Sequence, residues 1–337
     1  MSRTTRRVVR AALGGAAAVA LTLSGIGAAH AAVVTPSYES SPVGWASQNG
    51  GTTGGGSSTT VTVTSLSALE SAAASSTTEV IKVSGMFSGS GEVTVASNKT
   101  IIGVGSGSGL TGIGLKMKGV KNVIIRNMNI SKVTAASGDG DAIHIESSTN
   151  IWVDHNNLYS DTSHDEDYYD GLLDITHAAD YVTVSWNYLH DHNKTSLLGH
   201  SDDNASEDTG HLRVTYVHNW FNNTVQRMPR VRFGNPVHVL NNYYSNISSS
   251  GYAIASTEGA GVRVERNYFE NVPNTVICQT GDSSAGYTLL TNNYLVNSGT
   301  PAACSGANVK SLPYSYTPDA NSSVKSIVTA GAGTGKI

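Results

Sequence analysis

The sequence is poor in cysteine, phenylalanine and charge. It has two Cys and four Phe in 337 residues, and 14% of its residues are charged. Two thiols without clustered histidines are too few for a thiolate metal site. Thirty-six Gly, fifteen Tyr and abundant Ser, Thr, Asn and Val instead favour strands and turns over helices. We therefore expect an all-β fold.

The first 31 residues have the pattern of a secretory signal peptide. Four arginines precede the apolar run Ala11 to Ala29, and Ala29 to Ala31 is a small-residue cleavage site. We expect a mature, secreted chain of residues 32–337 with no membrane segment, folded as a single catalytic domain. An uncleaved anchor is the alternative, which the weak hydrophobicity of this Ala-rich and Gly-rich run disfavours.

The balance of charge is acidic once the leader is set aside. Removing its four arginines from the 21 basic residues leaves 17 against 25 acidic ones, a formal charge of −8. A chain of this charge is a poor general binder of nucleic acid, because the phosphate backbone repels it. We expect no nucleic-acid partner.

The two cysteines, Cys278 and Cys304, lie near the C-terminus. In an exported protein an isolated pair is most simply one disulfide that closes a loop. We predict that disulfide.

Short strands dominate the coarse reading of the N-terminal part. Residues 61–64, 80–83, 92–95 and 100–104 are β-rich runs separated by Gly, Ser and Asn. The single good helix is Ser67 to Ala74, for which we predict Ser67 as the N-cap of a capping box.

A loose repeat runs through the rest of the chain. A short apolar strand pattern followed by Asn recurs with spacings of 28, 31, 32, 23, 25 and 26 residues. The repeat is centred on Met128, Asn156, Asn187, Asn219, Asn242, Asn267 and Asn293. One strand pattern per period of this size is typical of a solenoid, whose coils bury their apolar faces against each other.

We predict a right-handed, single-stranded parallel β-helix with functional loops on one face. The recurring Asn suits a turn, because it tolerates the left-handed region and can bond an Asn one coil away. A β-sandwich is the alternative, but it predicts turns every 8 to 12 residues without the same Asn recurring in phase.

Four carboxylates occur as two closely spaced pairs in consecutive coils. Asp139 and Asp141 are at i and i+2, and Asp170 and Asp174 are at i and i+4. Coils stacked about 4.8 Å apart would let the four converge. Because oxygen-only clusters of this kind bind Ca²⁺, we predict a calcium site there, with turn-capping aspartates as the alternative.

Cationic side chains follow the acids along the chain. Lys194 comes one coil later, after His190 and His192, which we interpret as hydrogen-bonded structural histidines rather than zinc ligands. Val225 to Gly234 then holds Arg227, Arg230 and Arg232 within six positions. Calcium, Lys and Arg together indicate a polyanionic substrate that bears carboxylates.

These motifs together resemble the pectate lyases of polysaccharide lyase family 1. The resemblance is carried by Trp152 to His155, by Asp170 to Ile175, and by the R-x-P-x-x-R pattern from Arg227 to Arg232. It extends from about Val43 to the last coils. It implies a parallel β-helix that cleaves de-esterified homogalacturonan (polygalacturonate) by β-elimination, and we expect a monomer.

The resemblance also implies roles for individual residues. Arg227 matches the catalytic base, and Lys194 and Arg232 match substrate-carboxylate ligands. The calcium ligands would be Asp139, Asp141, Asp170 and Asp174, with Asp170 standing where some members have Glu. Trp152, Asp154 and His155 resemble a buried structural motif. Arg230 receives no role.

The chemistry agrees with these implied roles. A base must take the proton beside the uronate carboxylate, and free Arg is a weak base at a pKa of about 12.5 to 13.8. A positive charge about 4 Å away costs roughly 4 kcal/mol, or about 3 pKa units. With Ca²⁺, Lys194 and Arg232 nearby, we predict an alkaline optimum.

Three other functions compete with this one. The first is a pectin lyase of the same fold, which acts on methyl-esterified polymer. Pectin lyases lack a full calcium site, whereas four acids are present here. A β-helical polygalacturonase could use paired carboxylates as acid and base without Lys194 or Arg227. A non-catalytic carbohydrate-binding solenoid would show exposed aromatic tracks without a convergent ion site.

Overall fold

The structure is a computed structural model that describes Met1 and residues 38–337. The expected leader, residues 1–31, lies outside the described residues except for Met1, so it stays a prediction. In the part of the chain that is described, none of the helices is long and apolar enough to cross a membrane.

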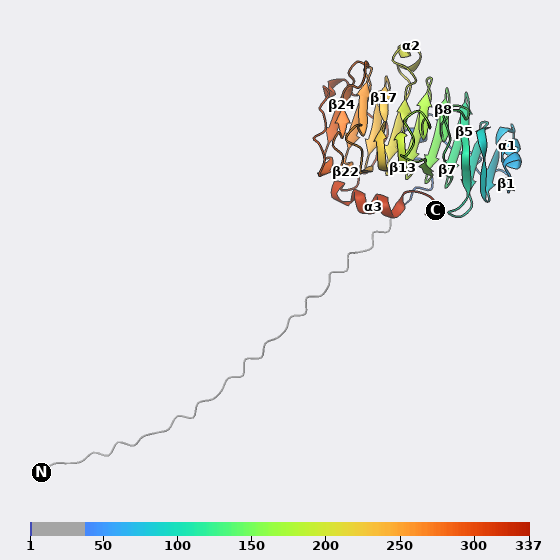
Figure 1. The fold of residues 1–337 in the computed structure, drawn as a ribbon, viewed down its shortest axis with the longest axis horizontal. Coiled ribbons are helices and arrows are strands. Elements are labelled where there is room, and N and C mark those ends of the chain that lie inside the picture. The colour runs from blue at the N-terminus through green and yellow to red at the C-terminus, as the bar shows by residue number, and fades with distance from the viewer. Residues whose placement is uncertain (2–37) are drawn as a thin grey trace. The chain divides into compact units, whose positions relative to one another are not determined.

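Parallel strands stack in successive coils along the molecule (Figure 1). One ten-stranded sheet forms a side of the stack. Its strands are β1 (Thr60–Val63), β2 (Glu79–Val83), β4 (Lys99–Gly103), β6 (Lys121–Arg126), β9 (Thr149–Asp154), β12 (Asp180–Ser185), β15 (Val214–Val217), β18 (Val237–Leu240), β21 (Gly261–Glu265) and β24 (Tyr287–Thr291).

A second sheet of fifteen strands supplies the other two sides. One row of it, which we call the site face, comprises β8 (Ile143–Glu146), β11 (Leu173–Thr176), β14 (Leu197–Leu198), β17 (Arg230–Arg232), β20 (Ile254–Thr257) and β23 (Val276–Ile277). The other row comprises β7 (Asn129–Ser131), β10 (Asn157–Tyr159), β13 (Tyr188–Lys194), β16 (Trp220–Gln226), β19 (Tyr243–Ser245), β22 (Tyr268–Glu270) and β25 (Tyr294–Val296). The long strand β5 (Gly109–Lys118) pairs with both rows and with β3 (Met86–Thr94).

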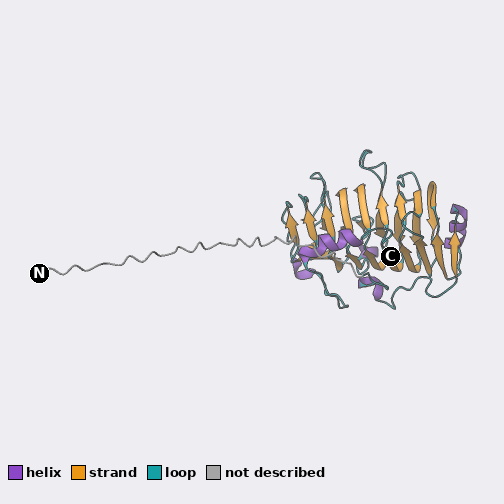
Figure 2. Cartoon of the chain, turned by 90° about the horizontal axis from the view of Figure 1, so that it is seen from below, coloured by secondary structure: helices purple, strands orange, loops and turns teal. Residues whose placement is uncertain are grey.

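Helices are few and lie outside the coils (Figure 2). The α-helix α1 (Leu66–Ala74) buries Leu69 and Ala73 at the end of the core that begins with β1, and α3 (Val324–Gly331) packs Val324 and Val328 on Tyr243. The remaining helical turns are α2 (Ala205–Asp208), η1 (Gly44–Ser47), η2 (Gly306–Asn308) and η3 (Asn321–Ser323).

The predicted cap of the first helix was wrong by two residues. Ser65, not Ser67, is the N-cap, and its Oγ accepts a hydrogen bond from the Ala68 amide at 3.3 Å. Ser67 instead lies within the first turn, so Glu70 is not the third residue of a capping box. The helix begins earlier because Leu66 is included in its first turn and packs against the core.

The recurring Asn forms a ladder through the interior of the stack. The side-chain amide of Asn156 donates to Asn187 Oδ1 at 2.9 Å, and Asn187 donates likewise to Asn219 at 2.9 Å. The ladder continues through Asn242, Asn267 and Asn293. Each buried amide is satisfied by its copy one coil away, which the in-phase repeat requires.

The left-handed residue of each turn is the one before the ladder Asn. His155, Trp186 and His218 have φ of 52°, 53° and 56°, and the ladder residues that follow them do not have positive φ. The bond between coils was therefore predicted correctly, whereas the left-handed conformation was assigned one residue too late. The ladder Asn must keep its side chain pointed along the stack, so the preceding residue makes the bend.

Candidate active site

The site face presents its polar side chains outward in rows. Parallel register pairs Lys116 with His144 and His144 with Asp174, while Ile143 and Leu173 beside them lie in the core. Because side chains alternate along a strand and neighbouring strands are in register, outward residues form lines across the coils. These lines run from the acidic residues toward the arginines of β17.

Two buried carboxylates face the bare backbone at Gly171. Asp141 Oδ1 accepts from the Gly171 amide at 2.7 Å, and Asp174 Oδ1 accepts from the Leu197 amide at 2.9 Å. A Cβ built on Gly171 would lie 2.5 Å from Asp141 Oδ1 and 2.6 Å from Asp174 Oδ1. Glycine therefore leaves open a small space lined by oxygens of both aspartates.

The charges of these carboxylates oppose each other. Burial raises the pKa of Asp174 well above its usual range, and the neighbouring Asp141 and Asp170 raise it further, while Arg227 counters the rise. Burial likewise raises the pKa of Asp141, with Asp170 adding to it. Asp170 therefore raises the pKa of both buried acids, whereas His144 lowers that of Asp141 and Arg227 lowers that of Asp174.

Asp139 pairs with a lysine and lies outside the buried pair at Gly171. Its carboxylate pairs with Lys116, and its backbone amide donates to Glu92 Oε1 at 2.8 Å. Burial raises the pKa of Asp139, but the bond and charge of Lys116 together with the charge of His144 and a bond with Glu92 leave that pKa lowered. His144 lies between the two acids, with Nδ1 at 2.6 Å from Asp141 Oδ2 and Nε2 at 3.7 Å from Asp139 Oδ2. Across residues 38–337, no three His, Cys, Asp or Glu side chains are grouped as metal ligands.

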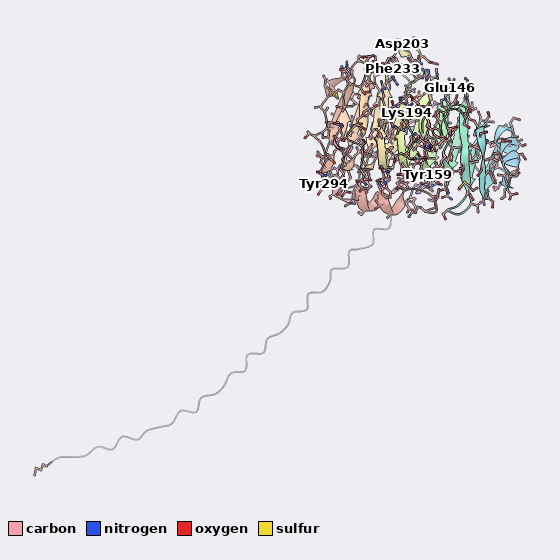
Figure 3. The ribbon with its side chains drawn as sticks, viewed as in Figure 1. Glu146, Tyr159, Lys194, Asp203, Phe233 and Tyr294 are labelled. Carbon is pink, nitrogen blue, oxygen red and sulfur yellow. A yellow bond between two sulfur atoms is a disulfide. The ribbon has the colours of Figure 1, made fainter. Side chains whose placement is uncertain are left out.

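Lys194 ends β13 and lies near the middle of the stack of coils (Figure 3). Its Nζ donates to Asp167 Oδ1 at 2.6 Å and lies 3.5 Å from Asp170 Oδ1. The lysine therefore adjoins the acidic group, as its position in the sequence suggested. Asp167, which sequence reasoning passed over, belongs to the loop 160–172 between β10 and β11.

Arg227 lies in the turn between β16 and β17. Its φ is 64°, in the left-handed region, and its carbonyl accepts from the Ser196 amide at 2.6 Å. A residue other than glycine that is held in a sparsely populated backbone conformation costs of order 1 to 3 kcal/mol. Its Nε is buried and, within the described residues, has no hydrogen-bond partner. The guanidinium is close enough to Asp174 to affect its pKa.

Arg230 and Arg232 share the outward face of β17. Arg232 Nε donates to Asp202, and Arg232 Nη1 donates to the Gly199 carbonyl at 3.0 Å. Asp202 lies in the loop between β14 and β15, and no sequence signal marked it. Burial raises the pKa of Asp202, but its bonds from Arg232 and Ser283 outweigh burial and lower it.

Two other interpretations agree with the geometry. Asp154 and His155 are fully buried, with Arg126 Nε at 2.6 Å from Asp154 Oδ2, as expected of a structural motif. His190 bonds Asp191 and Asn157, and His192 Nε2 lies 2.8 Å from the Asp170 carbonyl oxygen. These contacts hold the histidine rings in structural hydrogen bonds.

A separate hollow lies away from these residues. It is open to solvent, has a volume of about 720 Å³ and is lined by Trp45, Tyr181, Arg213 and Lys310 among others. Arg213 there is already paired with Asp180. None of the predicted site residues lines this hollow, so the candidate site is the open surface of the site face.

Known proteins are similar to this chain in both sequence and fold. A pectate lyase family model matches residues 19–337. A probable pectate lyase A of Neosartorya fischeri is 44% identical over 94% of this chain and 96% of its own length. A pectate trisaccharide-lyase of Bacillus licheniformis is 45% identical over 73% of this chain and 70% of its own length.

A solved structure agrees with the sequence matches. A pectate lyase from Bacillus sp. N165 in complex with trigalacturonate superposes with a TM-score of 0.80 at 34% identity, covering 88% of this chain and 99% of that one. The predicted right-handed parallel β-helix is confirmed by the parallel sheets and this likeness. The chain belongs to the pectate lyase family.

Proposed function

We propose that this protein binds polygalacturonate across the site face and cleaves its α-1,4 links by β-elimination. The observation that carries the proposal is that the cations lie on and beside the strands that carry the acids. Lys194 lies 3.5 Å from Asp170, Arg227 is close enough to lower the pKa of Asp174, and Arg232 lies on β17, two strands from β11. Cations on an outward face suit a polymer with one carboxylate per sugar. The trigalacturonate complex of the Bacillus sp. N165 relative supports the same substrate class.

Each cation has a separate task in the elimination. Lys194 and Arg232 hold uronate carboxylates, and Arg227 takes the proton from the carbon beside one of them. The electrons of that C–H bond form a C=C bond as the glycosidic oxygen on the neighbouring carbon departs. The products are a chain end that takes up a proton and an unsaturated uronate.

The fit of the residues to Ca²⁺ supports a calcium-dependent reaction. Asp141 and Asp174 supply oxygen ligands around the space that a Cβ at Gly171 would fill, and burial raises the pKa of both. No third acid is grouped with this pair among the described residues, so Asp170, 3.5 Å from Lys194, would have to turn toward the pair to join it, and Asp139 would have to leave Lys116. When bound, calcium would acidify the proton beside the carboxylate and stabilise the enolate-like charge.

The cellular setting follows from the leader and the substrate. We propose that the chain is secreted after removal of residues 1–31 and acts as a monomer on extracellular pectate. The described helices contain no membrane span.

One assay tests the proposed function. The purified enzyme is incubated with polygalacturonate, with calcium or with chelator, and the ultraviolet absorbance of the unsaturated product is followed. We expect a rise that calcium restores after chelation. Release of reducing ends without absorbance would indicate hydrolysis, and activity only on methyl-esterified pectin would indicate a pectin lyase.

A further inference from the structure

Arg230 has no task in the mechanism above, although it shares the outward face of β17 with Arg232. Leu197 pairs with Arg230, and its neighbour Leu198 pairs with Ile175, next to Asp174. Arg230 is therefore two strands from Asp174 along one outward row, roughly 10 Å at the usual strand spacing. It lies on the surface over which the polymer would pass.

Arg230 and Arg232 are linked by two residues from distant parts of the chain. Arg230 Nη2 donates to Ser283 Oγ at 2.6 Å, and Ser283 Oγ donates in turn to Asp202, at 2.7 Å from Oδ2 and 2.9 Å from Oδ1. Arg232 Nε donates to the same carboxylate. A hydroxyl suits this place because one oxygen can accept from the guanidinium and donate to the carboxylate.

The charges of this network do not balance. Two guanidinium groups face one carboxylate, and Arg230 Nη2 is 3.9 Å from Asp202 Oδ1. Burial lowers the pKa of Arg230, and the neighbouring Arg232 and Arg227 lower it further. Like charges held this close repel, so the arrangement needs both an anchor and a further anion.

Donors for that anion are present. The bond to Ser283 is the one hydrogen bond that the Arg230 side chain makes within the described residues, whereas a guanidinium has five N–H donors, of which the buried Nε is also unpaired. Its side chain is 14% exposed, so part of the group reaches the surface. A planar guanidinium with free donors is well suited to a carboxylate.

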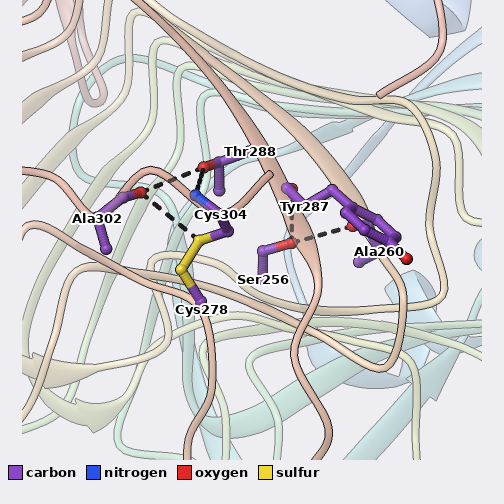
Figure 4. Close-up of a disulfide and its surroundings, with 7 residues drawn as sticks. All are labelled: Ser256, Ala260, Cys278, Tyr287, Thr288, Ala302 and Cys304. Carbon is purple, nitrogen blue, oxygen red and sulfur yellow. Dashed lines mark hydrogen bonds between the residues drawn. A yellow bond between two sulfur atoms is a disulfide. The ribbon is translucent and has the colours of Figure 1, made fainter. Parts of the chain in front are cut away.

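Ser283 is itself held firmly. It lies in the loop between β23 and β24, which begins at the confirmed disulfide Cys278–Cys304 (Figure 4). The Gly286 amide donates to the Cys278 carbonyl at 3.1 Å and closes the loop. Ser283 is fully buried, so its hydroxyl has little freedom to leave the network.

We propose that Arg230 is a further substrate-binding residue, which takes a uronate carboxylate next to the one held by Arg232. Ser283 is a positioning residue for Arg230, and Asp202, which accepts from both Ser283 and Arg232, is a positioning residue for Arg232. This inference rests on polygalacturonate as the substrate. It also implies that Arg230 contributes to the enzyme's preference for free carboxylates over methyl esters.

The test compares neighbouring serines. Ser283→Ala removes the link, whereas the control Ser284→Ala removes a hydroxyl that bonds Glu258 instead. For Ser283→Ala and for Arg230→Gln we expect KM for polygalacturonate to rise about tenfold with kcat within about twofold, the loss of one charge-assisted hydrogen bond. Ser284→Ala should match the wild type.

A double-variant cycle separates positioning from a general structural effect. Because Ser283 acts through Arg230, the double variant should be no worse than Arg230→Gln alone. The kcat/KM ratio of polygalacturonate over highly methyl-esterified pectin should fall in Arg230→Gln and stay higher in Arg230→Lys. Asp202→Asn, with Asp203→Asn as its control, probes the same link if Ser283→Ala does not fold, which circular dichroism would reveal.

The outcomes separate this inference from the function beneath it. A wild-type enzyme that releases no unsaturated product overturns the proposed function. An active wild type with unchanged KM in Arg230→Gln, or with additive effects of Arg230→Gln and Ser283→Ala, overturns the inference alone.

Discussion

Lys194 Nζ donates a hydrogen bond to Asp167 Oδ1 at 2.6 Å, while the side chain of Asp167 is 83% exposed. The lysine that we assign to a uronate carboxylate is thus paired with a carboxylate of the protein itself. Lys194 lowers the pKa of Asp167 and keeps it ionised. Asp167 therefore competes with substrate for the charge of Lys194.

Removing that competitor should strengthen substrate binding. We expect Asp167→Asn to lower KM for polygalacturonate by no more than about fivefold, since an exposed ion pair is weak. Asp165→Asn makes the same change of charge on the same loop without contacting Lys194, so it is the control. A higher KM in Asp167→Asn would instead mean that this acid assists binding.

Gly171 should tolerate no side chain. In Gly171→Ala the new Cβ would meet oxygens of Asp141 and Asp174, so we expect at least a tenfold loss of calcium-dependent activity, comparable to losing a metal ligand's support. Gly107→Ala, where a Cβ meets nothing within 4 Å, is the matched control. Titration with calcium should show a weaker apparent affinity in Gly171→Ala, and equal affinity in the two variants would argue against a metal at this place.

Arg227→Lys should abolish turnover while the coils stay intact. A shorter side chain with a single nitrogen cannot reach the same proton, and general-base catalysis typically contributes 10²- to 10⁴-fold. Arg263→Lys on β21, in the ten-stranded sheet, makes the same exchange away from the site face. Product absorbance measures the rate and circular dichroism the fold. Residual activity near the wild-type level would remove Arg227 as the base.

The pH dependence of stability should reflect His238. Burial lowers the pKa of this fully buried histidine, although Glu265 opposes the effect, and Arg263 adds to it. Below about pH 6.5 the unfolded chain binds a proton that the folded His238 resists, so the free energy of unfolding should fall with decreasing pH. Urea unfolding at pH 7 and pH 5 measures this. Between pH 7 and pH 5 the free energy of unfolding of His238→Gln should fall less than that of the wild type. His200 is exposed, so His200→Gln should show the same fall as the wild type.

Periodic features could be predicted because neighbouring coils impose the same condition on each repeat. Asn156 and Asn187 recur in phase because each must meet the amide of the next coil. Cys278 and Cys304 were the only possible pair among the cysteines of the chain. The shared face of Arg230 and Arg232 was not predicted, although it follows from their spacing of two residues once β17 is known to be a strand.

Contacts made through loops were decided by the tertiary structure alone. Asp202 and Ser283 are 81 positions apart and meet only because two loops extend over the same strands. Asp139 has the spacing of a partner of Asp141, yet Lys116 on β5 attracts its carboxylate. Spacing along a strand determines which face a side chain occupies. Which charged groups surround that side chain depends on the loops and coils beside it. No local pattern in the sequence encodes those neighbours.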